Sequence, residues 1–489
     1  MAKSQWSYST ATELSAALAA RKVSAVELAQ DAIGRIERHD SRINAICVRD
    51  FARGLDAAAA ADAARARGET GPLLGIPLTV KESYNVAGLP TTWGFPAQKD
   101  FIPQQDALSI SRVKTAGGVI LGKTNVPVGL GDWQSYNEIY GTTNNPWDLA
   151  RTPGGSSGGS SAALAAGFGP LSLGSDIGGS LRVPAHFCGI FAHKPTHNLV
   201  PPRGGNPPFT SPLPGSSDLA VVGPMARTAA DLAALFEVIA GPDELDDGVG
   251  YRLALPAPRT TKLSDARILV LDTHPSGRTD ASVASALGAL SEGLAKARAK
   301  ISRSSPLLPD LDVAAHLYMR LLLATLMARA PAASQAEARK ATAELDSADT
   351  SFAADRLRGA TSSYSDWFGD NVGRLRLRAQ WRAFFRDFDA LICPISPTAA
   401  FPHDREPDQE ARKLVVNGEP QPYLDMLFWP GIATLPGLPA TAAPIGRTPE
   451  GLPIGAQIVG PWLEDRTTLA LAGLIEREFG GFVPPPGLS

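Results

Sequence analysis

Two clusters of glycine and serine, at 154–159 and 174–180, constrain the fold of this 489-residue chain more than any other feature. Glycine lacks a Cβ atom, so it allows tight turns and close backbone approach that other residues resist. Clusters of this composition commonly form flexible linkers between domains. Here, however, apolar segments typical of buried strands flank both clusters. We therefore predict two tight turns inside one folded core.

Short apolar runs alternate with helical patterns along the chain, which predicts an α/β architecture. Buried strands are expected at 73–82, 117–123, 171–176, 267–272, 389–398 and 452–460. Helices are expected at 106–116, 161–167, 227–241 and 465–478, and over most of 10–67. Within that last region Thr10 and Ser24 are candidate N-caps, and Glu27 completes a capping-box pattern with Ser24.

The chain contains no internal repeat, and it is expected to form a single domain over 1–489. Its core is predicted to comprise 66–275 and 388–479, with the catalytic region at 72–200 and N-terminal helices at 1–65. The stretch 280–385 is mostly helical in pattern and carries no chemical motif. We interpret it as a variable helical insertion or cap rather than as a separate folding unit.

Charge and cysteine content narrow the function classes. Lys plus Arg total 46 and Asp plus Glu total 49, so the formal net charge of −3 does not indicate nucleic-acid binding. Cys47, Cys188 and Cys393 are too few and too far apart for a disulfide framework or a zinc site. Neither a signal-peptide pattern nor a run of about 18 apolar residues is found. We expect a cytoplasmic protein that binds no membrane.

Three short motif matches are interpreted as coincidences. The match at 117–124 to a phosphate-binding loop places its apolar strand inside the motif, and Pro127 disfavours the helix that must follow. The nucleophile-elbow match at 154–158 is preceded by a loop sequence instead of a strand. The Ser-x-x-Lys match at 111–114 lacks the companion motifs of β-lactamases.

Lys81, Ser156 and Ser180 together fit one mechanism. A serine hydroxyl is a weak nucleophile until a base accepts its proton, and no histidine lies in these motifs, so the base would be Lys81. Lysine normally has a pKa near 10.4, and burial without a counter-charge lowers it. Lowering that pKa to about 7.5 costs on the order of 4 kcal/mol. We therefore predict an apolar environment for Lys81, without a carboxylate in direct contact. Strand alternation puts the neighbouring Glu82 on the opposite face, which is consistent with this prediction.

The glycines of the two clusters have separate predicted uses. Gly178 and Gly179 let the backbone turn so that successive N–H groups point at one spot, where they stabilise a developing oxyanion. The glycines around Ser156 allow a strained backbone, from which this serine can bridge the lysine and a nucleophile.

The region PGGSSGGSSAALAAG followed by LSLGSDIGGSLRVPAHFCGI resembles the signature region of the amidase signature family. GIPLTVKE resembles the lysine segment of that family, and ILGKTN, GTTNNPWD and the C-terminal LPGLPATAAPIG and GLPIGAQIVG also resemble family segments. The resemblance therefore covers nearly the whole chain and is weakest at about 280–385. It implies a single α/β/α domain in which helices sandwich a large mixed β-sheet, with no metal or cofactor.

The resemblance also implies a role for each site residue. Ser180 would be the acylated nucleophile, Ser156 the relay serine reached through a cis peptide bond from Gly155, and Lys81 the general base and later the acid. The oxyanion hole would consist of the N–H groups of Ile177, Gly178, Gly179 and Ser180.

Departures from the family pattern bear on the substrate. Val183 stands where several members carry a polar residue, which favours an acyl group other than a small charged acid. Trp133, Phe428 and Trp429 are candidates for an apolar or aromatic pocket, and Trp133, Val183 and Trp429 form the predicted substrate-binding set. His193 is interpreted as structural.

We therefore predict an amidase that hydrolyses C–N bonds of neutral carboxamides, with aryl acylamides, carbamates and esters as open classes. The first alternative is the glutamine-hydrolysing component of a transfer-RNA-dependent amidotransferase, its A subunit, which acts inside a complex. The second is a catalytically silent scaffold, which the presence of Lys81, Ser156 and Ser180 disfavours. The expected partner is a small-molecule amide, and a homodimer is left open.

Overall fold

The computed structural model describes residues 6–208 and 210–488. The strands are β1 (Ile46–Arg49), β2 (Pro77–Lys81), β3 (Val119–Thr124), β4 (Tyr136–Asn137), β5 (Gly141–Thr142), β6 (Leu171–Asp176), β7 (Phe191–Lys194), β8 (Val221–Ala226), β9 (Arg267–Val270), β10 (Lys300–Ser302), β11 (Ala390–Pro394), β12 (Lys413–Val416), β13 (Glu419–Pro422), β14 (Ala440–Arg447) and β15 (Pro453–Val459).

The helices are α1 (Ala11–Ala19), α2 (Ala25–Ile43), α3 (Phe51–Ala66), α4 (Leu108–Thr115), α5 (Gly158–Ala165), α6 (Arg182–Cys188), α7 (Ala229–Ile239), α8 (Ala281–Lys296), α9 (Leu311–Met327), α10 (Ala332–Ala343), α11 (Phe352–Ala360), α12 (Tyr364–Asp387), α13 (Phe428–Thr434) and α14 (Asp465–Phe479).

One mixed sheet of eleven strands forms the centre, in the order β1-β3-β2-β6-β8-β7-β14-β15-β11-β9-β10. Strands β3, β2 and β6 are parallel neighbours, as are β11, β9 and β10. The strands between these groups, from β6 to β11, pair antiparallel. The predicted α/β class with a large mixed sheet is confirmed.

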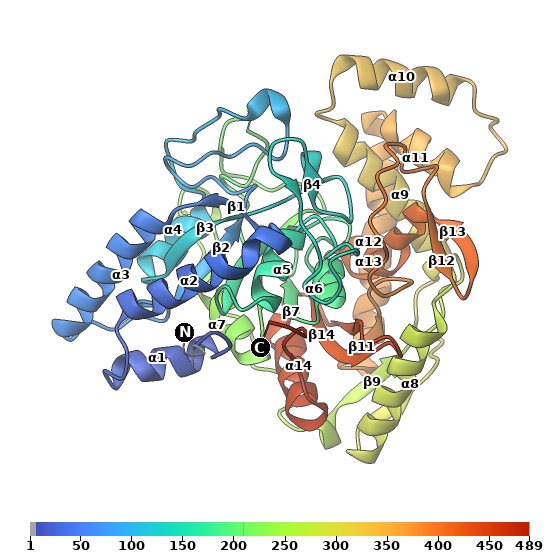
Figure 1. Ribbon diagram of the computed structural model, residues 1–489. Helices are drawn as coiled ribbons and strands as arrows, with labels where there is room; N and C mark the ends of the chain where they lie inside the picture. Colours follow the sequence, from blue (N-terminus) through green and yellow to red (C-terminus); the bar gives the residue numbers. More distant parts are fainter. Residues whose placement is uncertain (1–5, 209, 489) are drawn as a thin grey trace.

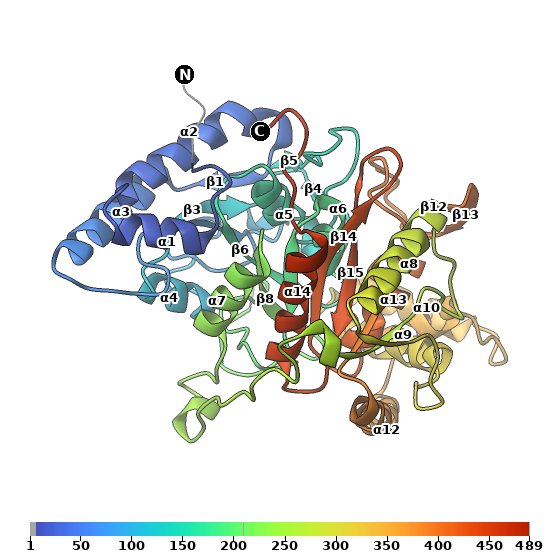
Figure 2. The same cartoon turned by 90° about the horizontal axis from the view of Figure 1, so that it is seen from below.

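Alternation along the strands divides the core into two layers, one on each face of the sheet. In β9, Ile268 faces one hydrophobic cluster and Leu269 faces the other. Residues of α1 to α4, α7, α8 and α14 belong to the first cluster, and residues of α6, α9, α12 and α13 belong to the second. Because successive strand residues point to opposite faces, helices cover both sides. Figures 1 and 2 show α1 to α4 at one end of the sheet and α9 to α13 at the other.

The predicted helix starts at Thr10 and Ser24 are confirmed. Each serine or threonine oxygen accepts the backbone N–H three residues on, from Glu13 and Glu27 respectively, and each glutamate closes a capping box. The N-terminal segment is not purely helical, however, because β1 lies between α2 and α3 and pairs with β3 at the sheet edge. Four residues are too few to show a strand periodicity next to two strong helices.

The stretch 280–385 also departs from a purely helical pattern. Its strand β10 pairs with β9 and forms the other edge of the sheet. Helix α8 packs on β14 and β11. This stretch therefore contributes β10 and α8 to the central sheet and its helical cover, and it also forms helices α9 to α12. Among the described residues, no helix combines the length and the apolar character needed to cross a bilayer.

Candidate active site

Lys81 ends strand β2 in the interior of the molecule, and its side chain is fully buried. Its Nζ lies 2.7 Å from Ser156 Oγ and 2.9 Å from Ser175 Oγ. Burial lowers the pKa of Lys81 from 10.5 to about 7, and the negative charge of Asp176 opposes this shift only in part. Near neutral pH a large fraction of this amine is uncharged and able to accept a proton.

Glu82 is kept apart from this lysine by strand alternation, as expected. Its carboxylate accepts the backbone N–H groups of Thr92 at 2.5 Å and Trp93 at 3.0 Å. Those bonds satisfy the carboxylate within the neighbouring turn, so Glu82 supplies no direct ion pair that would hold Lys81 protonated.

Ser156 lies on the glycine-rich loop that precedes α5. The Gly155–Ser156 peptide bond is cis, as the resemblance implied. Gly155 is required by close packing, because an added Cβ atom would lie 2.3 Å from the carbonyl oxygen of Asp132. Ser135 fixes the loop from outside, since its hydroxyl donates to the carbonyl of Gly154 at 3.0 Å and accepts the N–H of Gly158 at 3.1 Å.

Ser180 lies on the turn between β6 and α6, and 6% of it is exposed. Its carbonyl accepts the backbone N–H of Ser157 at 3.2 Å, which joins the turn at 177–181 to the loop of Ser156. Because Ser180 is the predicted nucleophile, we call residues 177–181 the nucleophile turn. Gly179 has a φ of +99°, a left-handed conformation that favours glycine. An added Cβ atom there would also lie 2.8 Å from Pro430.

Asp176 organises the nucleophile turn from its buried carboxylate. It accepts the N–H groups of Gly179 at 2.9 Å and Leu181 at 3.1 Å, and it pairs with the buried guanidinium of Arg182 at 2.9 Å. Burial by itself raises the pKa of Asp176, but the adjacent Arg182 outweighs it and holds that pKa below the usual value. The carboxylate therefore stays ionised.

The expected oxyanion hole needs one correction. The N–H of Gly179 donates to Asp176 and is occupied in this conformation. The N–H groups of Ile177, Gly178 and Ser180 remain as the expected donors. The sequence could not show this, because Asp176 precedes the glycines by three residues and only the turn brings its carboxylate back onto Gly179.

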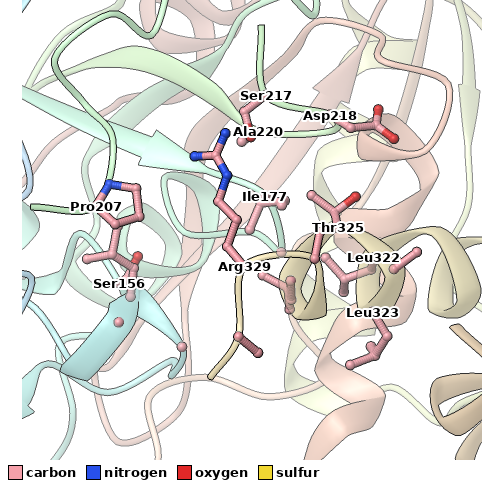
Figure 3. A pocket seen from close by; sticks show the side chains of 18 of the residues that line it. Ser156, Ile177, Pro207, Ser217, Asp218, Ala220, Leu322, Leu323, Thr325 and Arg329 are labelled. Carbon is pink, nitrogen blue, oxygen red and sulfur yellow. The ribbon is translucent and has the colours of Figure 1, made fainter. Parts of the chain in front are cut away.

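A cavity of about 1400 Å³ opens above these residues and includes Ser156, Ser175, Ile177, Gly178 and Ser180 in its lining. Figure 3 shows Ser156 and Ile177 together with residues of α9 and of the loop before β8. Aromatic and aliphatic side chains make up much of the remaining wall; they are Trp93, Phe95, Leu130, Trp133, Leu322, Leu323, Leu326, Tyr364, Trp367, Leu424 and Leu427.

Of the predicted substrate-binding set, the structure places only Trp133 on the cavity wall. Val183 is fully buried in α6, where its side chain packs behind Gly179. Trp429 is buried in α13 with its indole ring against His274. Both predictions were wrong about position, because the sequence does not show which face of these two short helices points to the cavity. Phe428 stacks on the same His274 ring and is likewise buried.

Sequence reasoning missed Ser175, Leu427 and Trp93. Ser175 lies near the end of strand β6, which pairs in parallel with β2, and this register brings its hydroxyl to Lys81. The available signal was a serine near the end of a strand that neighbours the strand of Lys81. The other two residues come from loops and a short 3₁₀ turn, whose course local patterns do not predict.

His193 is structural, as expected. Its ring nitrogens contact Thr441 Oγ1 at 2.9 Å and Asp465 Oδ1 at 3.1 Å in the core. Within residues 6–208 and 210–488, the His, Cys, Asp and Glu side chains form no group of three or more that is suited to a metal ion.

Known proteins resemble this chain in sequence over most of its length. Residues 27–469 match the family described as Amidase. The A subunit of the glutamyl-tRNA(Gln) amidotransferase from Acidothermus cellulolyticus is 34% identical, over 96% of this chain and 94% of that protein.

Solved structures share the fold over almost the full length. One is an inhibitor-bound chain of a vestigial protein complex connected with the origins of an s-triazine catabolic enzyme; it is 28% identical with a TM-score of 0.81, over 96% of this chain and 98% of that one. A bacterial aryl acylamidase, 23% identical over 98% and 97% of the two chains, shares the fold with a TM-score of 0.80. This chain therefore belongs to the amidase signature family of amide-cleaving enzymes.

Proposed function

We propose that this enzyme hydrolyses neutral carboxamides with apolar acyl groups through an acyl-enzyme on Ser180. The observation that carries the proposal is the buried amine of Lys81, which lies 2.7 Å from Ser156 Oγ at the base of a large, mainly apolar cavity that Ser180 also lines. An amine with a pKa of about 7 accepts a proton without help from a histidine.

In the first step the oxygen of Ser180 attacks the amide carbon. The proton of Ser180 passes to Ser156 Oγ, and the proton of Ser156 passes to the free electron pair of Lys81 Nζ. The carbonyl oxygen becomes an oxyanion, which free backbone N–H groups of the nucleophile turn stabilise. The C–N bond then breaks, the leaving nitrogen takes a proton from Ser156, and Lys81 returns one to Ser156.

Water completes the cycle by the same route. Its oxygen attacks the acyl carbon, and its proton moves through Ser156 to Lys81. When the ester bond to Ser180 breaks, the serine oxygen recovers a proton and the free acid leaves. Lys81 thus serves as base and acid in alternation, which a pKa near the working pH allows.

The walls beside the nucleophile turn favour an apolar acyl group. A Cβ atom added to Gly178 would meet Leu427 at 3.3 Å and Trp133 at 3.9 Å, so these side chains border the turn directly. The nearby carboxylate of Asp132 is already bound by Arg412 at 2.6 Å and by the hydroxyl of Tyr423 at 2.6 Å. Polar recognition next to the scissile bond is therefore limited, and apolar burial supplies most of the binding free energy.

Glutamine hydrolysis is the second candidate, because a relative that is 34% identical to this chain is the A subunit of a glutamyl-tRNA(Gln) amidotransferase. One further observation favours it. Arg356 is paired with Glu410 at 2.6 Å, whereas Arg329 has no hydrogen-bond or ion-pair partner in the described parts of the chain. The Arg329 side chain extends across the cavity toward Ser217 and Ala220 (Figure 3), where a free guanidinium could bind a carboxylate.

A substrate panel separates the two candidates. Purified enzyme is assayed with p-nitroanilides of increasing acyl length and with glutamine, and Arg329→Gln is tested beside the wild type. We expect kcat/KM to rise with acyl length and to be unchanged by Arg329→Gln. Glutamine as the best substrate, with a loss of at least about tenfold in Arg329→Gln, would instead support the amidotransferase function.

A further inference from the structure

The nucleophile turn is held from outside by two ring side chains that the sequence did not assign to catalysis. The hydroxyl of Tyr318, on α9, donates to the carbonyl of Ile177 at 2.6 Å. The indole Nε1 of Trp133 donates to the carbonyl of Gly178 at 2.9 Å. Both donors are buried, with 1% and 7% of the residue exposed respectively.

These two bonds fix two successive peptide planes. In a planar trans peptide the C=O and the following N–H point in opposite directions. The peptide between Gly178 and Gly179 is held at both ends, since its carbonyl meets Trp133 and its N–H meets Asp176 at 2.9 Å. The peptide between Ile177 and Gly178 is held at its carbonyl by Tyr318, which leaves the Gly178 N–H pointing the other way.

The Gly178 N–H has no acceptor among residues that the structure describes, although Gly178 itself lines the cavity. A fixed, unoccupied N–H beside a serine nucleophile is suited to stabilise a tetrahedral oxyanion. Its direction is set by the hydrogen bond that Tyr318 makes on the far side of the same peptide.

Tyr318 is itself rigidly placed. Helix α13 packs Gly431 against its ring so closely that an added Cβ atom would lie 2.7 Å from Tyr318 Cδ1. Burial raises the pKa of Tyr318 above its usual value, so the hydroxyl keeps its proton and remains a donor. Tyr318 does not line the cavity, so its contact with the turn is separate from substrate binding.

We propose that Tyr318 is a positioning residue that orients the Gly178 N–H toward the oxyanion of the acylation step, and that Trp133 holds the adjoining peptide plane in place. The inference rests on the proposed function and deepens it, because it assigns to α9 a part in transition-state stabilisation. It predicts that removal of the Tyr318 hydroxyl weakens binding of the tetrahedral state and leaves binding of the planar amide unchanged.

The test compares Tyr318→Phe with Tyr84→Phe. Tyr84 is a matched control because it is also 1% exposed and its hydroxyl also donates to a backbone carbonyl, that of Gly174 on β6. For each protein we measure kcat and KM on an anilide, and the inhibition constant of a trifluoromethyl ketone with the same acyl group, which adds a serine oxygen to give a tetrahedral adduct.

For Tyr318→Phe we expect kcat and ketone affinity to fall together by about 10- to 100-fold, with KM within about twofold of the wild type. For Tyr84→Phe we expect all three constants within about twofold. A folded Tyr318→Phe enzyme with normal kcat would overturn the proposal, and so would equal losses in kcat and ketone affinity in both variants. If Tyr318→Phe does not fold, kcat, KM and ketone affinity are measured for Trp133→Phe, which also lines the cavity. A fall in kcat and ketone affinity with KM unchanged supports the proposal, and equal changes in KM and ketone affinity would overturn it.

Failure of the proposed function gives a different result. In that case the wild-type enzyme itself forms no ketone adduct, before any variant is compared. A wild-type adduct with an unaffected Tyr318→Phe would reject only the positioning role.

Discussion

At the scale of single residues, the pKa of Lys81 connects activity to pH. An amine acts as a base only when it is uncharged, and burial brings the pKa of Lys81 to about 7. The value of kcat/KM should therefore rise between about pH 6 and pH 8 and then level off. Lys81→Met should lose this rising limb together with most of the activity. A pH–rate profile of unchanged shape in Lys81→Met would contradict the assignment of the base.

The same residue makes a prediction about stability. The pKa of Lys81 is lower in the folded protein than in the unfolded chain, so the unfolded chain binds more protons between about pH 7 and pH 10. Its contribution to stability therefore improves as the pH rises through that window. Lys81→Met should raise the free energy of unfolding at pH 7 by roughly 1–4 kcal/mol, at about 1.36 kcal/mol for each pKa unit.

Urea titrations at pH 7 and pH 9 check this expectation. The difference in stability between Lys81→Met and the wild type should shrink at the higher pH. The reason is that Lys81 of the unfolded wild-type chain is less fully protonated at pH 9 than at pH 7. A variant that is less stable than the wild type at pH 7 would show that the hydrogen bonds of Lys81 outweigh its desolvation.

Ser156 and Ser175 both contact the amine of Lys81, but they should differ in their effect on rate. Only Ser156 is proposed to pass protons, so Ser156→Ala should slow acylation by about a thousandfold. Ser175→Ala removes one hydrogen bond at 2.9 Å that orients the amine and should slow acylation by about tenfold. Stopped-flow measurement of p-nitroaniline release distinguishes the two, and equal losses would indicate that Ser175 also carries protons.

At the scale of elements, Arg182 joins the nucleophile turn to two distant segments. Its guanidinium binds Asp176, the carbonyl of Pro430 at 3.0 Å and Gln457 Oε1 at 2.7 Å, and thereby links β6 and α6 to α13 and β15. Removal of one partner from a buried ion pair leaves the other charge unpaired. Arg182→Gln should therefore lower the free energy of unfolding by about 3–5 kcal/mol.

An exposed pair on α3 provides the control for that prediction. The side chain of Arg53 is 48% exposed where it pairs with Asp50, so Arg53→Gln should change the free energy of unfolding by less than about 1 kcal/mol. Urea titration measures both variants. Similar small losses in the two would mean that the buried network around Asp176 relaxes without strain.

Elements with a strong local pattern were predictable, and those defined by distant partners were not. The short apolar runs of β2, β6 and β11 and the capping boxes of α1 and α2 contain their own signals. Strands β1 and β14 do not, because one has four residues and the other contains Pro444 and is specified by pairing with β7 and β15. Likewise the sequence identified Lys81 but not Ser175, whose approach to it follows from the sheet register.

At the scale of the whole molecule, the proposed catalytic groups and much of the cavity wall come from different parts of the chain. Lys81, Ser156 and Ser180 lie within one hundred residues, on strands and turns whose motifs the sequence displays. The opposite wall comes from α9, α12 and the segment at 408–427, where no motif was recognised. The reaction class was therefore open to prediction, while the substrate-binding residues depend on how distant helices pack on the second face of the sheet.

The proposed mechanism depends most on covalent attachment of the acyl group to Ser180. The most direct measurement is rapid quenching of the enzyme during turnover of an apolar p-nitroanilide, followed by peptide mass spectrometry. We expect the acyl mass on the peptide that contains Ser180 and its absence in Ser180→Ala. An acyl group on another residue, or steady turnover with no covalent adduct while Ser180→Ala stays active, would contradict the account.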